Sequence, residues 1–129
     1  MVIQKNTVNN CIFTLAEKTT LTPVYYLFEF INTQDDSILT FTCTDISVNK
    51  LRYNEFEIEE TSNEDRLTGK ITLDLLGSYK YNIYEQSSAT NLVVANSGSL
   101  IETGRIDVKG TEQTDETFEE TRTIAVFND

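Results

Sequence analysis

Apolar side chains recur at every second position along most of this 129-residue chain, and the spacing typical of an amphipathic helix is nearly absent. The clearest stretch runs from residue 71 to residue 86, where one alternating run meets a Gly77-Ser78 turn and a second run follows. The alternating apolar positions are Ile71, Leu73, Leu75, Tyr79, Tyr81 and Ile83. A period of two places successive side chains on opposite faces of a strand. The sequence therefore predicts an all-β protein.

The same pattern predicts seven or eight short strands, with turn signals every 8–12 residues. The predicted strands are 11–15, 24–32, 37–45, 51–60, two runs within 67–84, 92–94 and 100–108. The 24–32 segment is apolar on both faces, so we expect it to be central or to meet a partner with its outer face. Within 51–60 the apolar residues switch from one set of alternating positions to the other, which predicts a bulge near Asn54. The glycine at position 104 predicts a bulge or a close approach of the backbone to a neighbouring group. An antiparallel sandwich fits this organisation best, with a small closed barrel as the alternative.

The spacing Gly77-x-Tyr79-x-Tyr81 resembles the corner of immunoglobulin-like sandwiches, where a Tyr hydroxyl bonds back to the backbone. We therefore expect residues 1–110 to form an antiparallel immunoglobulin-like β-sandwich. Residues 111–129 differ in composition. Dense carboxylates up to Glu120 predict a mobile acidic linker, and Thr121–Phe127 predicts a terminal strand. That strand either closes its own sheet or acts as an arm that pairs with a neighbouring subunit's sheet edge.

The formal charge is −11, from 21 acidic and 10 basic residues. Phosphate contacts dominate nucleic-acid affinity, so we expect a chain this acidic to be repelled by DNA, RNA and anionic membranes. Three interpretations of the charge stay open: solubility, a partner with a basic surface, or mimicry of DNA. The first residues contain no long apolar run, so we expect no signal peptide, and no stretch is long enough to predict a membrane span.

The sequence predicts no catalytic, cofactor-binding or metal-binding residue, and we expect a protein that is not an enzyme. It contains no His, no phosphate-binding glycine loop and no calcium loop. Glu55, Glu57 and Glu59 share one face of a predicted strand and are interpreted as a solvated face. The pair Asp35-Asp36 together with Asp45 predicts either a loosely held cation or simple turn capping.

Cys11 and Cys43 fall on the apolar parity of their segments, so we expect two buried free thiols rather than a disulfide or a zinc site. Tyr25 and Tyr84 fall on the parity opposite the predicted core. We interpret them as half-buried residues of a sheet surface rather than as a platform for sugar stacking.

Several segments taken together resemble small β-sandwich virion proteins of the crAss-like group of tailed bacteriophages. The resemblance covers about residues 9–110 and rests on the order and spacing of its segments. The segments are 11–21 (CIFTLAEKTTL), 25–30 (YYLFEF), 44–47 (TDIS), 52–56 (RYNEF), 77–88 (GSYKYNIYEQSS) and 101–108 (IETGRIDV).

The resemblance implies a non-enzymatic structural role, as an auxiliary or decoration protein on the exterior of the capsid. Its implied partners are the major capsid protein or other virion proteins, with a homo-oligomer in the particle and assembly in the host cytoplasm. One alternative is a tail- or fibre-associated module that binds host surfaces or glycans through loops 61–67 and 87–98. A second alternative is an acidic DNA-mimic inhibitor.

Overall fold

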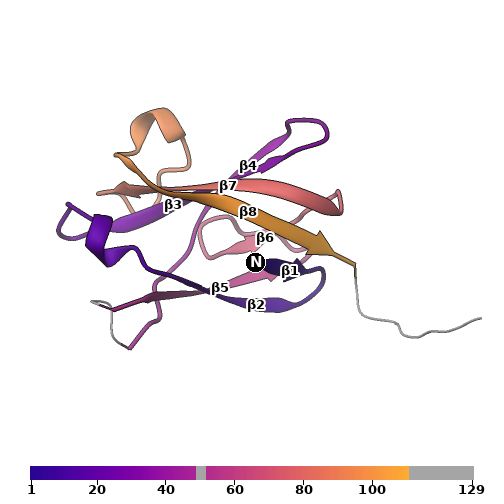
Figure 1. Cartoon of the computed structure of the whole chain (residues 1–129), viewed down its shortest axis with the longest axis horizontal. Coiled ribbons are helices and arrows are strands. Elements are labelled where there is room, and N and C mark those ends of the chain that lie inside the picture. Colours follow the sequence, from indigo (N-terminus) through magenta and orange to yellow (C-terminus); the bar gives the residue numbers. More distant parts are fainter. Residues whose placement is uncertain (49–51, 111–129) are drawn as a thin grey trace, which may run out of the picture.

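The computed structural model describes residues 1–48 and 52–110, which form two β-sheets packed face to face (Figure 1). The five-stranded sheet has the order β1 (Val2–Gln4), β8 (Leu100–Lys109), β7 (Gly77–Gln86), β3 (Tyr25–Asn32) and β4 (Ile38–Thr42). The three-stranded sheet has the order β2 (Val8–Phe13), β5 (Asn54–Glu60) and β6 (Lys70–Ile71). Helical structure in this part of the chain consists of two short 3-10 turns, η1 (Ala16–Lys18) and η2 (Val94–Asn96). The prediction of an all-β protein is confirmed. The predicted acidic linker and terminal strand, within 111–129, lie outside the described residues.

The pairing of the strands corrects several details of the sequence-based prediction. The sheets are mixed, because β1 pairs with β8 and β5 pairs with β6 in parallel. The strand predicted to carry Ile71, Leu73 and Leu75 ends at Ile71, although Leu73 stays buried and Leu75 is half-buried. The alternation of apolar residues indicates which side chains are buried, but it does not show which residues pair with a neighbouring strand. The 92–94 strand is replaced by a loop that leads into η2. Asn54 begins β5, and the one register shift that the described ladders show lies between Ile83 and Tyr84.

Aromatic side chains from both sheets meet between the layers and form the core. Phe28 of β3 lies with its ring centroid 5.0 Å from that of Phe56 of β5 and 6.0 Å from that of Phe13 of β2. Phe28 also stacks on Phe41 of β4, with centroids 5.1 Å apart. Burying a side chain of this size stabilises the fold by roughly 1.5–3 kcal/mol. The core cluster of described residues runs from Ile3 to Val108.

Strand β3 is central, as one of the two interpretations of its apolar faces predicts. It pairs with β7 on one side and with β4 on the other, and Leu27 on its outer face is fully buried. The loop between β7 and β8 reaches this outer face, where Thr40 Oγ1 donates to the Leu92 carbonyl at 2.8 Å. Tyr84 is half-buried there, and its hydroxyl donates to Glu29 Oε1 at 3.2 Å.

Two buried carboxylates hold irregular segments against the sheets. Glu60 accepts hydrogen bonds from the backbone N–H groups of Asn6 and Leu73, each at 2.9 Å. Glu85 accepts from the N–H of Thr20 at 2.8 Å, the hydroxyl of Thr20 at 2.8 Å and the N–H of Leu21 at 3.2 Å. Both Glu side chains lie on the core parity of their strands, and each residue is 2% exposed. Hydrogen bonds to these carboxylates offset the cost of burying charge.

Gly104 of β8 provides the close backbone approach that the sequence predicted. A Cβ atom at this position would lie 2.6–2.7 Å from the ring and hydroxyl of Tyr81 on the neighbouring strand β7. The glycine therefore makes room for the Tyr81 ring in the core.

The two cysteines are free thiols, as predicted, although only Cys11 is fully buried. Cys43 is half-buried, and its Sγ donates to the Glu57 carbonyl at 3.1 Å. Burial raises the pKa of each thiol to about 11.

Candidate functional site

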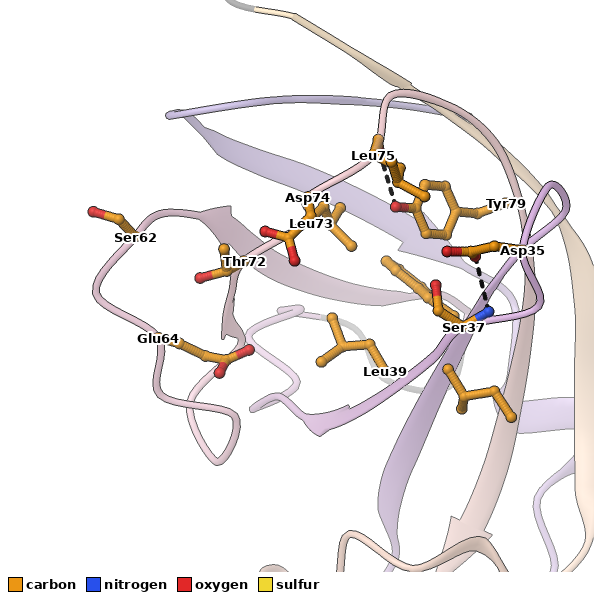
Figure 2. A pocket seen from close by; sticks show the side chains of 12 residues that line it. Asp35, Ser37, Leu39, Ser62, Glu64, Thr72, Leu73, Asp74, Leu75 and Tyr79 are labelled. Atoms are coloured by element: carbon orange, nitrogen blue, oxygen red, sulfur yellow. Dashed lines mark hydrogen bonds between the residues drawn. The ribbon is translucent and has the colours of Figure 1, made fainter.

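The described part of the chain contains a cavity of about 550 Å³ beside the start of β4, between that strand and the segments 62–64 and 72–75 (Figure 2). We call it the β4 cleft. Its floor is apolar and its rim is polar. The floor residues are Phe30, Leu39, Leu73, Leu75 and Tyr79, and the rim carries Asp35, Glu64 and Asp74 with hydroxyls from Ser37, Ser62 and Thr72.

The turn from β3 to β4 sets the position of Asp35 at the rim. Asn32 is buried at the end of β3, and its Oδ1 accepts from the N–H groups of Gln34 at 2.8 Å and Asp35 at 3.3 Å. Asp35 Oδ1 then accepts from the Ser37 N–H at 3.0 Å (Figure 2). The hydrogen bonds from Ser37 lower the pKa of Asp35, so this side chain is ionised at neutral pH.

The hydroxyl of Tyr79 holds in place the 72–75 segment, which forms the side of the cleft opposite β4. This hydroxyl donates to the Leu75 carbonyl at 2.8 Å, across the corner at which β7 begins (Figure 2). Gly77 occupies this corner with a φ of +105°, a conformation that favours glycine. The bond holds the 72–76 segment over the cleft, and it is the back-bond that the Gly-x-Tyr-x-Tyr spacing predicted.

Strand β4 is an open edge of the five-stranded sheet. The Asn32 N–H donates to the Ser37 carbonyl, so alternate peptide groups from Ser37 onward face β3, and those of Ile38, Thr40 and Thr42 face outward. The outward N–H of Thr42 donates to the Arg66 carbonyl at 2.8 Å. Within the described residues, the outward N–H groups of Ile38 and Thr40 have no such partner. The edge is therefore closed at Thr42 and open beside the cleft.

These features suit the binding of a chain segment in extended conformation. An open strand edge provides main-chain hydrogen bonds for a segment added in extended conformation. The cleft floor accepts an apolar side chain, and the three rim carboxylates favour positive charge. Within the described residues, no three His, Cys, Asp or Glu side chains are grouped in a way that could hold a metal ion.

The structure separates the Asp residues that the sequence grouped as a possible cation site. Asp35 and Asp36 precede β4, whereas Asp45 follows it. Asp45 accepts from the N–H and hydroxyl of Ser47 and from Asn54 Nδ2, at 3.0, 2.7 and 2.6 Å. Burial works to raise its pKa, but these hydrogen bonds outweigh burial and lower it. Of the two interpretations, turn capping fits these contacts.

Glu55, Glu57 and Glu59 share the outward face of β5, as predicted, and Glu59 lies 3.6 Å from the Lys70 ammonium. Tyr25 is 42% exposed.

The sequence analysis missed the β4 cleft. Its rim residues come from three separate segments, and β4 is an edge strand only because of the order in which the strands are arranged in the sheet. The sequence analysis also missed the structural carboxylates Glu60 and Glu85, which core parity could have found.

Compared with family models, curated proteins and solved structures, the chain matches none of them. The described residues include no helix with the length and apolar character needed to cross a membrane.

Proposed function

We propose that this chain is a non-enzymatic structural protein of a tailed-phage virion, an auxiliary protein bound to the outer capsid shell. The observation that carries the proposal is the β4 cleft, in which an open strand edge lies beside an apolar floor and an acidic rim. This arrangement is suited to assembly, because an extended segment of a partner can add to the edge and be held by side chains in the cleft.

The proposed partner is a basic, extended segment of the major capsid protein. Its backbone would pair with the outward peptide groups of Ile38 and Thr40, and a Lys or Arg side chain would lie near Glu64 and Asp74. Packaged DNA repels an acidic protein, so a chain with a net charge of −11 is better suited to the outside of the shell. This placement also fits the resemblance to crAss-like virion proteins.

In finer detail, we propose that the fold is an immunoglobulin-like sandwich. Two observations support this: the Tyr79–Leu75 back-bond at the start of β7, and the division of the strands into sheets of five and three. The mixed pairing of β1 and β6 departs from the purely antiparallel form.

The first test is quantitative mass spectrometry of purified particles, with the major capsid protein as the internal standard. Shell decoration predicts hundreds of copies per particle. A few dozen copies or fewer would favour the tail- or fibre-associated alternative, and absence from the particle would refute the virion proposal.

A charge-reversal pair tests the β4 cleft itself. The double variant Glu64→Lys/Asp74→Lys should lower occupancy of the particle by about tenfold, which corresponds to about 1.4 kcal/mol of binding energy. The control is Glu55→Lys/Glu57→Lys, which makes the same change in charge on the outward face of β5. Equal losses for the two variants would mean that overall charge, and not the cleft, governs attachment.

A further inference from the structure

The edges of the two sheets differ in how the chain protects them. At β1, the Asn9 side chain pairs with both backbone groups of Gln4, since Oδ1 accepts from its N–H at 3.0 Å and Nδ2 donates to its carbonyl at 3.2 Å. At β6, Lys70 exchanges backbone hydrogen bonds with Asp65. At β4, the Arg66 carbonyl occupies one end of the edge. Capping of this kind keeps the capped part of a sheet edge from pairing with another chain, so β4 stays open only at Ile38 and Thr40.

Strand β2 has the longest unprotected edge among the described strands. Glu60 N–H donates to the Thr7 carbonyl, and this pair sets the register in which alternate residues of β2 face β5. The peptide groups of Val8, Asn10 and Ile12 consequently face away from β5. Within residues 1–48 and 52–110, the N–H groups of these three residues donate to no acceptor of the chain.

The side chains of β2 also leave this edge accessible. Val8 and Ile12 are 50% and 61% exposed, and the strand contains no charged residue and no Pro. Charged side chains and Pro are the usual means of blocking an edge. An uncharged six-residue edge with exposed β-branched side chains is thus prepared to pair with a further strand.

The chain leaves the described fold next to this edge. Lys5 N–H donates to the Lys109 carbonyl at 3.0 Å, so the end of β8 lies beside the turn that leads into Val8 (Figure 1). Ten residues, 111–120, then separate Gly110 from Thr121. At full extension they span about 35 Å, which exceeds the roughly 20 Å length of a six-residue strand. Residues 121–127 can therefore reach a β2 edge on a neighbouring copy as well as on their own.

We propose that residues 121–127 (TRTIAVF) pair with the β2 edge of a second copy of this chain. Ile124 and Val126 share one face of the added strand and would lie beside Val8 and Ile12. Arg122 shares that face and would bring a positive charge toward the carboxylates of β5. This inference concerns self-association and does not depend on the proposed capsid partner.

Charge favours a neighbouring copy over the chain's own edge. The connecting residues carry Glu112, Asp115, Glu116, Glu119 and Glu120. A linker with this density of like charge favours extension. Folding it back along its own β2 would also bring it toward Glu55, Glu57 and Glu59 on the adjoining strand. An extended linker that delivers the strand to a second copy keeps its own carboxylates apart and away from those of its own β5.

Complementation between two full-length variants tests the proposal. Asn10→Pro removes an outward N–H and blocks the acceptor edge, while its own segment 121–127 stays intact. Ile124→Pro disrupts the donor segment, while its own β2 edge stays intact. By sedimentation, we expect wild type to self-associate, each variant alone to sediment at the monomer mass of 14.7 kDa, and the mixture to form a 1:1 heterodimer.

The matched control is Ile38→Pro, which removes an outward N–H at the start of the β4 edge and should leave self-association unchanged. Each variant is used only if it keeps cooperative thermal unfolding. Ile12→Lys replaces Asn10→Pro if the latter does not fold. A wild type that is monomeric at hundreds of micromolar would overturn the proposal, and so would an equimolar mixture that stays monomeric. Loss of association in Ile38→Pro alone would assign the contact to β4 and also overturn it.

Discussion

The buried carboxylate of Glu85 should determine much of the stability of the segment that leads into β3. Its three hydrogen bonds come from Thr20 and Leu21, and two of the donors are backbone N–H groups. Hydrogen bonds to charged groups contribute about 1.5–3 kcal/mol each. Thr20 is exposed and Leu21 is half-buried, so water can reach these donors when the carboxylate is removed. Because the effects of neighbouring bonds are also not additive, we expect Glu85→Ala to lower the free energy of unfolding by about 2–3 kcal/mol.

Glu85→Gln separates the charge from the shape. The amide oxygen can still accept from both backbone N–H groups, and its NH₂ group can donate to the hydroxyl oxygen of Thr20. Only the charge-assisted part of the interaction is lost, so we expect a loss of about 1–1.5 kcal/mol at pH 7. The control Glu57→Gln makes the same change on the exposed face of β5 and should change stability by less than about 0.5 kcal/mol.

The dependence on pH gives a second, independent readout. Burial works to raise the pKa of Glu85, but the hydrogen bonds from Thr20 and Leu21 outweigh it, and the folded-state pKa is lowered from its ordinary value of 4.5. A lowered pKa means that the ionised group stabilises the fold fully above 4.5, and this stabilisation is lost as pH falls through the folded-state value. The gap between wild type and Glu85→Gln should therefore stay constant at neutral pH and close in acid.

Urea denaturation followed by circular dichroism at several pH values measures both quantities. In thermal unfolding, the expected gap of about 1–1.5 kcal/mol corresponds to roughly 4–12 °C in Tm for a folded region of this size. The reasoning would be refuted if Glu85→Gln matched Glu57→Gln at pH 7. It would be refuted equally by a gap that persisted unchanged to pH 3.

Two further predictions use positions inside the core. Gly104→Ala should destabilise the fold by about 1–3 kcal/mol in thermal unfolding, because the new methyl group meets the Tyr81 ring. The control is Gly110→Ala, which should be close to neutral because the nearest atom to its new Cβ would be 3.8 Å away. Equal effects at both glycines would contradict the packing argument. Cys11 and Cys43, with pKa values of about 11, should react with Ellman's reagent far more slowly at pH 8 in the folded protein than in urea. Equal rates in the two states would show that the thiols are accessible.

Period-two parity predicted which side of each strand is buried with few errors. In β7, Tyr79, Tyr81 and Ile83 face the core as the alternation requires. Parity succeeds because burial depends on which face of a strand a side chain occupies, and the sequence contains that information directly. The same rule would have identified Glu85 as a core carboxylate, although its charge alone suggested an exposed position.

Pairing between strands could not be predicted in the same way. The extended run through Leu73 is buried yet has no ladder partner beyond Ile71, and β1 joins β8 in parallel although the two strands come from opposite ends of the described chain. Both outcomes depend on contacts between segments that are far apart in the chain. The β4 cleft and the open β2 edge follow from the same long-range order, so no local pattern could have revealed them.

The net charge of −11 is a poor guide to how the surface binds, because some of the carboxylates are structural. Glu60 and Glu85 are only 2% exposed and are held by N–H donors of the chain itself. The remaining negative charge includes the rim of the β4 cleft and the outward face of β5. Exposed charges at contact distance gain only about 1 kcal/mol in water, and salt screens them.

For the proposed partner at β4, backbone pairing and burial on the cleft floor would therefore supply most of the affinity, while the rim would select for positive charge. Such binding should weaken modestly when salt is raised. A DNA mimic, in contrast, binds through many charge pairs on a surface such as the β5 face, and its affinity should fall steeply with salt. The slope of partner affinity against salt concentration consequently separates the two functions even when the partner's structure is unknown. A shallow slope favours the cleft, and a steep slope favours the acidic face.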